Sequence, residues 1–63
     1  MIRDQIEKFL QDDFDNFEIT NFEISQNEVS VDFTSDSYQY FALYKIKIID
    51  SQTIVSPELL LEL

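Results

Sequence analysis

The residues of this sequence that are most able to do chemistry are carboxylates, and they are concentrated in one stretch. Between Lys8 and Lys45 the chain has no positive charge, and this stretch holds almost all of the formal net charge of −9. Like charges on a small domain oppose the compact state. A dense field of one sign therefore indicates a function or a demand for solubility. The carboxylates are Asp12, Asp13, Asp15, Glu18, Glu23, Glu28, Asp32 and Asp36.

The composition excludes most catalytic chemistry. The chain has no His and no Cys, so a general base or nucleophile would have to be Asp, Glu, Tyr, Ser, Thr or Lys. Paired carboxylates do acid–base work where burial or close approach separates their pKa values, whereas these residues fall on the solvent side of predicted strands. The absence of Gly excludes glycine-rich phosphate loops. We predict that the chain is not an enzyme and uses no cofactor.

A metal site is not expected either. Without Cys or His the usual zinc ligands and disulfides are missing. The acidic run 12–16 resembles a calcium loop only superficially. With Asp13 as the first ligand, Phe17 falls at the fifth ligand position and no Gly follows it.

Size and charge limit the class of protein. We expect residues 1–63 to form one domain that buries only about 60% of the surface of its unfolded chain. No stretch reaches the roughly 20 apolar residues of a membrane span, and no signal peptide is recognisable, which favours a cytoplasmic location. The acidic surface argues against direct binding to nucleic acid or to anionic membranes.

The hydrophobic spacing predicts an α+β fold. Residues 2–14 are predicted to form a helix, because apolar residues recur at spacings of three and four and so form one face. The acids at 12 and 13 suit a helix C-terminus poorly, because that end carries partial negative charge. The helix therefore either ends near Gln11 or keeps these two acids for another reason. Strands follow over about 16–25 and 28–34, joined by a hairpin. The sequence Asn-Phe-Glu-Ile occurs twice, and the two copies are offset by five residues. Because side chains alternate between the faces of a strand with a period of two, an odd offset would put the two Phe-Ile pairs on opposite faces. A β-bulge near Thr20–Asn21 would bring all four apolar side chains to one face.

The rest of the chain predicts a longer antiparallel sheet. The bulge sets Ile24 opposite Val29, Phe22 opposite Val31 and Ile19 opposite Phe33. A turn at 35–37 and a long strand at 38–49 follow, with Phe33 expected opposite Tyr38. Thr53–Val55 would add a short fourth strand. Ser56-Pro57-Glu58 then resembles a helix start, so a short C-terminal helix carrying the leucines is expected.

This arrangement places an acidic, polar surface on the solvent side of the sheet. Same-face neighbours lie about 6.6–6.8 Å apart along a strand and strands about 4.8 Å apart. DNA has one charge per about 3.4 Å of each strand, so the surface is sparser but of the same order. One interpretation is that these carboxylates bind a partner that normally binds phosphates. The competing interpretation is that they only keep the solvent-exposed face of the sheet hydrated and the protein soluble. The candidate binding acids are Glu18, Glu23, Glu28, Asp32 and Asp36, with Asp12, Asp13 and Asp15 at the rim.

Two apolar residues disturb the solvation interpretation. Phe41 and Leu43 have the parity of the acidic side, where the predicted pairing sets them beside Ser30 and Glu28. Apolar anchors ringed by charge are typical of a protein-binding hot spot. Equally, the C-terminal leucines could cover them, or the strand could bend between Ala42 and Tyr44.

The composition resembles that of small acidic inhibitors, many of phage origin, which mimic DNA to block restriction, repair or CRISPR enzymes. That resemblance rests on charge and on no sequence motif. It implies a protein partner with a basic nucleic-acid-binding groove. The alternative is a small homodimeric interaction or assembly module, joined through the C-terminal leucines or an edge strand, whose acidic face is only solvation.

Overall fold

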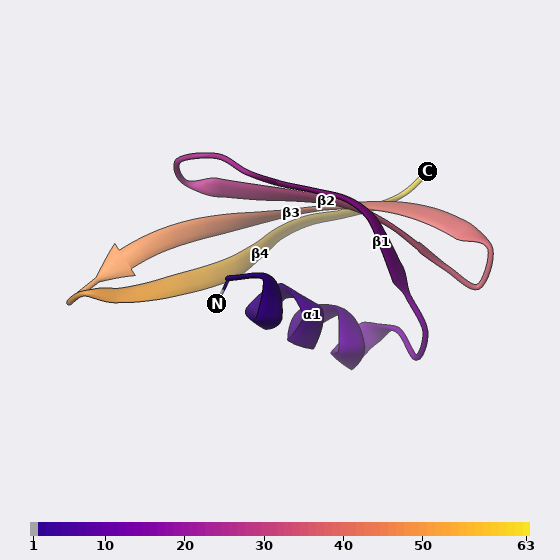
Figure 1. The fold of residues 1–63 in the computed structure, drawn as a ribbon, viewed down its shortest axis with the longest axis horizontal. Helices are drawn as coiled ribbons and strands as arrows, with labels where there is room; N and C mark the ends of the chain where they lie inside the picture. Colours follow the sequence, from indigo (N-terminus) through magenta and orange to yellow (C-terminus); the bar gives the residue numbers. More distant parts are fainter. Residues whose placement is uncertain (1) are drawn as a thin grey trace.

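The computed structural model describes residues 2–63 as one helix followed by a four-stranded antiparallel sheet. Helix α1 spans Ile2–Asp13, and the strands follow in spatial order β1-β2-β3-β4 (Figure 1). The strands are β1 (Glu18–Ile24), β2 (Glu28–Ser35), β3 (Tyr38–Ile49) and β4 (Gln52–Glu62). The predicted helix and antiparallel sheet are confirmed, and the fourth strand is present.

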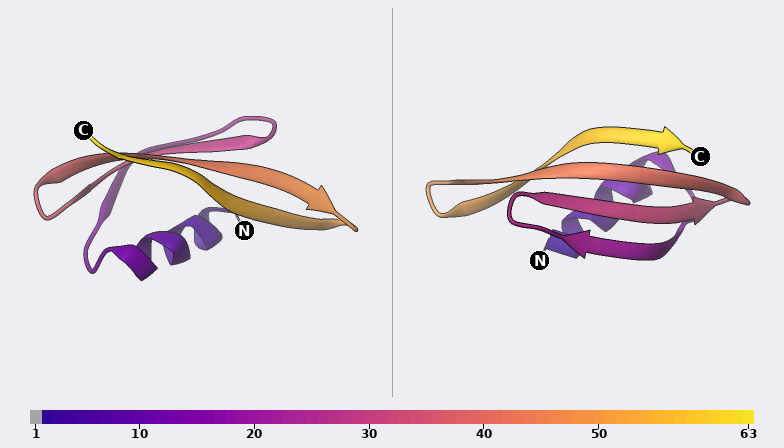
Figure 2. Two further views of the ribbon diagram at one scale, coloured as in Figure 1. Left: turned by 180° about the vertical axis from the view of Figure 1, so that it is seen from behind. Right: turned by 90° about the horizontal axis from the view of Figure 1, so that it is seen from above.

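The helix covers one face of the sheet, here called the inner face, and leaves the other open (Figure 2). Ile6 and Leu10 of α1 are buried against Val29, Val31 and Phe33 of β2. Their spacing of four residues places both on one side of α1. The acids at 12 and 13 do not end the helix early, and the amide of Phe14 continues its hydrogen bonding by donating to the carbonyl oxygen of Leu10 at 2.8 Å.

An aromatic cluster joins the helix end to the sheet. The Phe33 ring lies 5.1 Å from Phe14 and 5.2 Å from Tyr40, and Phe14 and Tyr40 are 4.9 Å apart between ring centroids. Phe9 stacks on Tyr44 at 5.5 Å. These spacings are those of favourable aromatic pairs, so the cluster fixes the helix against β2 and β3.

The β1–β2 register agrees with the sequence pattern. Ile24 pairs with Val29, Phe22 with Val31 and Ile19 with Phe33, and the register shifts between Ile19 and Asn21. Thr20 is therefore the extra residue of the predicted β-bulge, and its hydroxyl donates to the carbonyl oxygen of Asp32 at 3.1 Å.

The predicted β2–β3 register is wrong by two residues. Phe33 pairs with Tyr40 rather than Tyr38, because the turn contains only Asp36 and Ser37. Both residues have positive φ, 50° and 71°, as a two-residue hairpin turn of this type requires. A shift of two preserves which face each residue occupies, so the inner and outer assignments of β3 still hold.

The predicted C-terminal helix is wrong. The segment that was expected to form it is part of β4, which pairs with β3 along nearly its whole length. Pro57 is tolerated because β4 is an edge strand, and the register shifts beside it, leaving Glu58 as an extra residue. A two-turn helix is marginal in water, whereas ladder pairing satisfies the backbone of the whole segment.

The β3–β4 hairpin extends beyond the part of the sheet that α1 covers (Figure 1). Ile48 near its tip is 75% exposed. The tip turn uses Asp50 and Ser51, both with positive φ, as the β2–β3 turn does. A chain without Gly thus makes both two-residue turns with Asp-Ser.

We predict that Ser37→Gly stabilises the protein. Left-handed backbone costs a non-Gly residue about 1–2 kcal/mol, and the entropy that Gly loses on folding offsets part of the gain. The free energy of unfolding should rise by about 0.5–1 kcal/mol, measured by urea unfolding followed by circular dichroism. Ser30→Gly, in the middle of β2, is the control and should lower it. A destabilising Ser37→Gly would contradict the left-handed turn.

Candidate protein-binding face

The face of the sheet opposite α1, here called the outer face, divides into two halves according to side-chain type. On β1 and β2 it carries carboxylates, and over residues 41–43 of β3 and 59–61 of β4 it carries apolar side chains. Further along β3 the same face carries Lys45 and Lys47. The acidic half consists of Glu18, Glu23, Glu28 and Asp32. The apolar half consists of Phe41, Leu43, Leu59 and Leu61.

The bulge in β1 organises the acidic half. Because Thr20 is the extra residue, Glu18 and Glu23 both fall on the outer face, opposite Thr34 and Ser30. Both side chains are exposed, and within residues 2–63 neither forms an ion pair. Asp32 is half-buried and accepts a hydrogen bond from Asn21 Nδ2 at 3.4 Å. The bulge therefore leaves two carboxylates available and holds a third in place.

Lys45 lies between the two halves and engages two acids. Its Nζ is 3.3 Å from Glu28 Oε1 and 3.9 Å from Glu58 Oε2. These side chains are about 40% exposed, so the bridges contribute little to stability. They do neutralise Glu28, which is thus less available to a partner than Glu18 or Glu23.

The apolar half is formed by cross-strand pairs. Phe41 pairs with Leu61 and Leu43 with Leu59. On the other side, Phe41 lies opposite Asp32 and Leu43 opposite Ser30, so the predicted neighbours, Ser30 and Glu28, are corrected by the same two-residue shift. Leu59 and Leu61 therefore do not cover Phe41 and Leu43, and instead lie beside them and enlarge the apolar surface of the outer face.

Sequence reasoning missed Leu59 and Leu61 as members of this face. Three consecutive leucines, 59–61, have no period of two or of 3.6, so the pattern carries no signal for a strand. The one indication in the sequence was the short strand expected at Thr53–Val55, which the following residues could have continued.

Other predicted acids lie elsewhere. Asp36 is exposed in the β2–β3 turn, where its left-handed backbone conformation forms half of the two-residue hairpin turn. Asp12 and Asp13 lie in the last turn of α1, on the inner side of the sheet, and so do not form a rim to the outer face. Phe41 and Leu43 are half-buried, as expected for residues on an uncovered sheet face with large neighbours.

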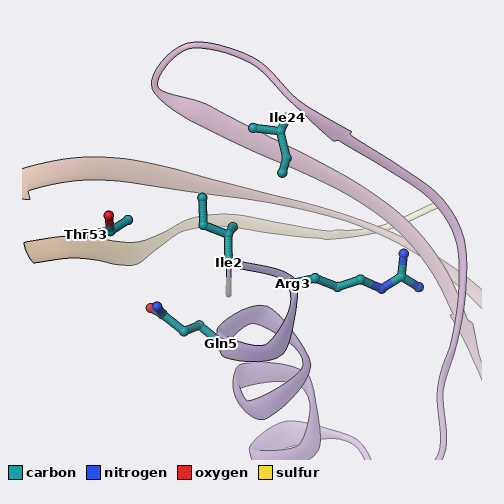
Figure 3. Close-up of a pocket in the computed structure, with 5 residues that line it drawn as sticks. All are labelled: Ile2, Arg3, Gln5, Ile24 and Thr53. Carbon is teal, nitrogen blue, oxygen red and sulfur yellow. The ribbon is translucent and has the colours of Figure 1, made fainter.

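A hollow of about 440 Å³ lies at the start of α1, between Ile2, Gln5, Ile24 and Thr53 (Figure 3). Arg3, the charged residue among the described ones that line it, points away from the hollow toward β1 (Figure 3). Its guanidinium carbon lies 5.2 Å from the centroid of the Phe22 ring, and its Nε lies 3.5 Å from Glu7 Oε2 of α1. Of the described residues that line the hollow, Gln5 and Thr53 are polar and uncharged. Among residues 2–63 no group of three or more Asp or Glu is placed to hold a metal ion.

Burial affects the ionisation of two tyrosines on the inner face. Burial raises the pKa of Tyr44, and the nearby Asp13 carboxylate raises it further. Burial also raises the pKa of Tyr40, with a further contribution from Glu62. In both cases the neutral phenol is favoured because the charged form is poorly solvated.

Comparisons with known proteins give no relative: no family model, curated protein or solved structure matches the chain. Within residues 2–63 the single helix is too short and too polar to cross a bilayer.

We predict a loss of stability at alkaline pH that Tyr44→Phe reduces. A raised folded-state pKa means that the folded protein holds the phenol proton more tightly than the unfolded chain does. This contribution to stability is complete below pH 10.0, the ordinary pKa of a tyrosine, and is lost as pH rises through the folded-state pKa. Urea unfolding at several pH values should show a shallower decline for Tyr44→Phe. Tyr38→Phe, which removes an exposed hydroxyl, controls for the substitution.

Proposed function

We propose that this chain is a non-enzymatic acidic binding protein whose outer face occupies a basic nucleic-acid-binding groove on another protein. The observation that carries the proposal is that the acidic half and the apolar half lie side by side on one uncovered sheet face. Asp32 of the acidic half is directly opposite Phe41 of the apolar half. Solvation alone accounts for the acids but not for four large apolar residues on the same face.

The charges favour a basic partner. Glu18 and Glu23 are exposed on the edge strand β1, and the chain as a whole carries a net charge of −9. Glu23 also borders a hollow of about 160 Å³, whose other acid, Glu28, is paired with Lys45. A lysine or arginine of the partner fits such a site, and the long-range field speeds the encounter of oppositely charged surfaces.

The apolar half favours a groove that binds bases as well as phosphates. Channels for single-stranded nucleic acid combine Lys and Arg with aromatic platforms on which bases stack. A ring beside a carboxylate, as at Phe41 and Asp32, presents an aromatic surface next to a negative charge, as a nucleotide does. The partner class we propose is therefore a cytoplasmic restriction, repair or CRISPR-type protein, inhibited as phage-encoded DNA mimics inhibit theirs.

A self-associating module is the second candidate. It is favoured by the apolar edge strand β4, and in that case the acids would serve solvation only. The two candidates differ in the effect of salt, because screening weakens binding to a basic partner and relieves repulsion between two acidic copies.

We predict that removing the two unpaired acids weakens partner binding. Proteins captured from a bacterial lysate at low salt would be purified and their affinity for the chain measured by calorimetry. Glu18→Gln with Glu23→Gln should reduce affinity about three- to tenfold, mainly through the association rate. Asp12→Asn with Asp13→Asn makes the same charge change on the helix side and should have little effect. Equal effects of the two pairs would exclude recognition by the outer face.

We also predict that Phe41 is an anchor for the partner. Phe41→Ala should weaken binding by about 30-fold or more, as expected for a hot-spot residue, while the matched truncation Ile48→Ala at the hairpin tip should not. Competing single-stranded or duplex DNA should displace the chain from its partner. A complex that neither DNA nor about 0.5 M salt dissociates would contradict the mimic proposal.

A further inference from the structure

The two edges of the sheet differ in how well they are protected against pairing with another strand. The β1 edge has seven residues, a bulge at Thr20 and two exposed carboxylates, all features that hinder strand addition. The middle of β4 is interrupted by Pro57 and by the extra residue Glu58. The stretch 59–63, which follows them, has neither Pro nor bulge, and four of its five residues are leucine.

The backbone of this stretch offers hydrogen bonds to a further strand. The amide of Leu63 donates to the carbonyl oxygen of Gln39 at 2.8 Å, which makes these two residues a hydrogen-bonded pair. Because bonded and non-bonded pairs alternate along an antiparallel ladder, Leu61 and Leu59 also bond to β3. The backbone groups of Leu60 and Glu62 therefore point away from β3. Figure 2 shows β4 as the outermost strand on that side, with no other element beside it.

The side chains along this edge are apolar and substantially exposed. Leu59 is 42% exposed, Leu61 45% and Leu63 71%. Leu59 and Leu61 continue the apolar half of the outer face, and Leu60, 48% exposed, lies on the inner face beside the end of α1. An exposed apolar edge with free backbone groups is the usual substrate for strand addition.

We propose that residues 59–63 pair antiparallel with the same residues of a second copy of this chain, about a two-fold axis at Leu61. In this register Leu60 exchanges hydrogen bonds with Glu62 of the partner subunit, and the symmetry repeats the exchange. Leu61 faces the partner's Leu61, and Leu59 faces the partner's Leu63. The outer face then gains a continuous leucine ladder between two β3 strands, each carrying Phe41 and Leu43.

Charge and side-chain type select this register over its neighbours. An axis at Leu60 would set Glu58 directly opposite the partner's Glu62, and like charges in that position repel. An axis at Ile54 would satisfy the backbone of Thr53 and Val55 but would set Gln52 opposite the partner's Ser56, leaving one apolar pair. Only the axis at Leu61 combines backbone pairing, apolar contacts and no opposed like charges.

The size of the interface and the net charge determine how the dimer should behave. One short strand buries less than the roughly 1,200–2,000 Å² of stable complexes, so we expect a dissociation constant in the micromolar range or weaker. Each copy carries a net charge of −9, and the partner's Glu62 would lie near Asp13. Added salt should therefore strengthen the dimer, the opposite of its effect on a basic partner.

Sedimentation equilibrium of the isolated chain tests the proposal. The wild-type chain should dimerise reversibly, and Leu61→Lys, which sets two cations face to face on the axis, should raise the dissociation constant at least about tenfold. Gln52→Lys is the control, because it introduces the same side chain on the same face of β4, opposite Ile49 and outside the paired stretch. A chain that stays monomeric at millimolar concentration and high salt would overturn the proposal.

Backbone methylation separates the strand pairing from the side chains. A synthetic chain with an N-methyl group at Leu60 loses only the outward amide donor and should not dimerise. The same modification at Thr53, whose amide also points outward, should leave the dimer intact. If both chains dimerise as the unmodified chain does, the copies associate elsewhere and the proposal is wrong.

A single cysteine reports the register, because the chain has none of its own. Leu61→Cys should form a disulfide-linked dimer rapidly under mild oxidation, since facing residues of a non-bonded pair have Cβ atoms about 4.5–5.5 Å apart. Faster linkage of Ile54→Cys would place the axis at Ile54 instead. All three measurements use the protein alone, so their failure would leave the proposed binding to a basic partner unaffected.

Discussion

The structure depends on one short helix covering a much longer sheet. A helix of 12 residues is about 18 Å long, whereas a strand of 12 residues such as β3 is about 40 Å long. The core therefore gathers where Ile6 and Leu10 meet the middle of β2 and β3, around Phe33. The outer face and the tip of the β3–β4 hairpin lie outside this cover.

The distribution of charge follows from the same constraint. No carboxylate is among the buried residues of the described chain, and the core consists of apolar and aromatic side chains. Among the described residues, Lys45 pairs with Glu28 and Glu58, and Arg3 pairs with Glu7, so cations compensate part of the repulsion between the carboxylates. A basic partner or screening by salt would relieve the repulsion.

Much of the fold could be predicted from local pattern. The repeat of Asn-Phe-Glu-Ile at an odd offset predicted the bulge at Thr20, and the bulge fixed both the β1–β2 register and the positions of Glu18 and Glu23 on one face. The β2–β3 register failed because Asp36 and Ser37 adopt left-handed backbone, which their residue types permit but do not signal. The error of two residues changed the neighbours of Phe41 and Leu43 but not their face.

By itself the sequence determined the helix, the alternation of the first three strands, the acidic stretch and the side of the sheet on which Glu18, Glu23, Glu28 and Asp32 lie, because periods of 3.6 and 2 are local properties. Only the tertiary structure decided the fate of residues 56–62. Ser-Pro followed by leucines suits a helix start and an edge strand alike, and the choice rests on the long partner that β3 provides. Pairing with β3 also brought Leu59 and Leu61 beside Phe41 and Leu43, a contact between distant segments that no local pattern contains.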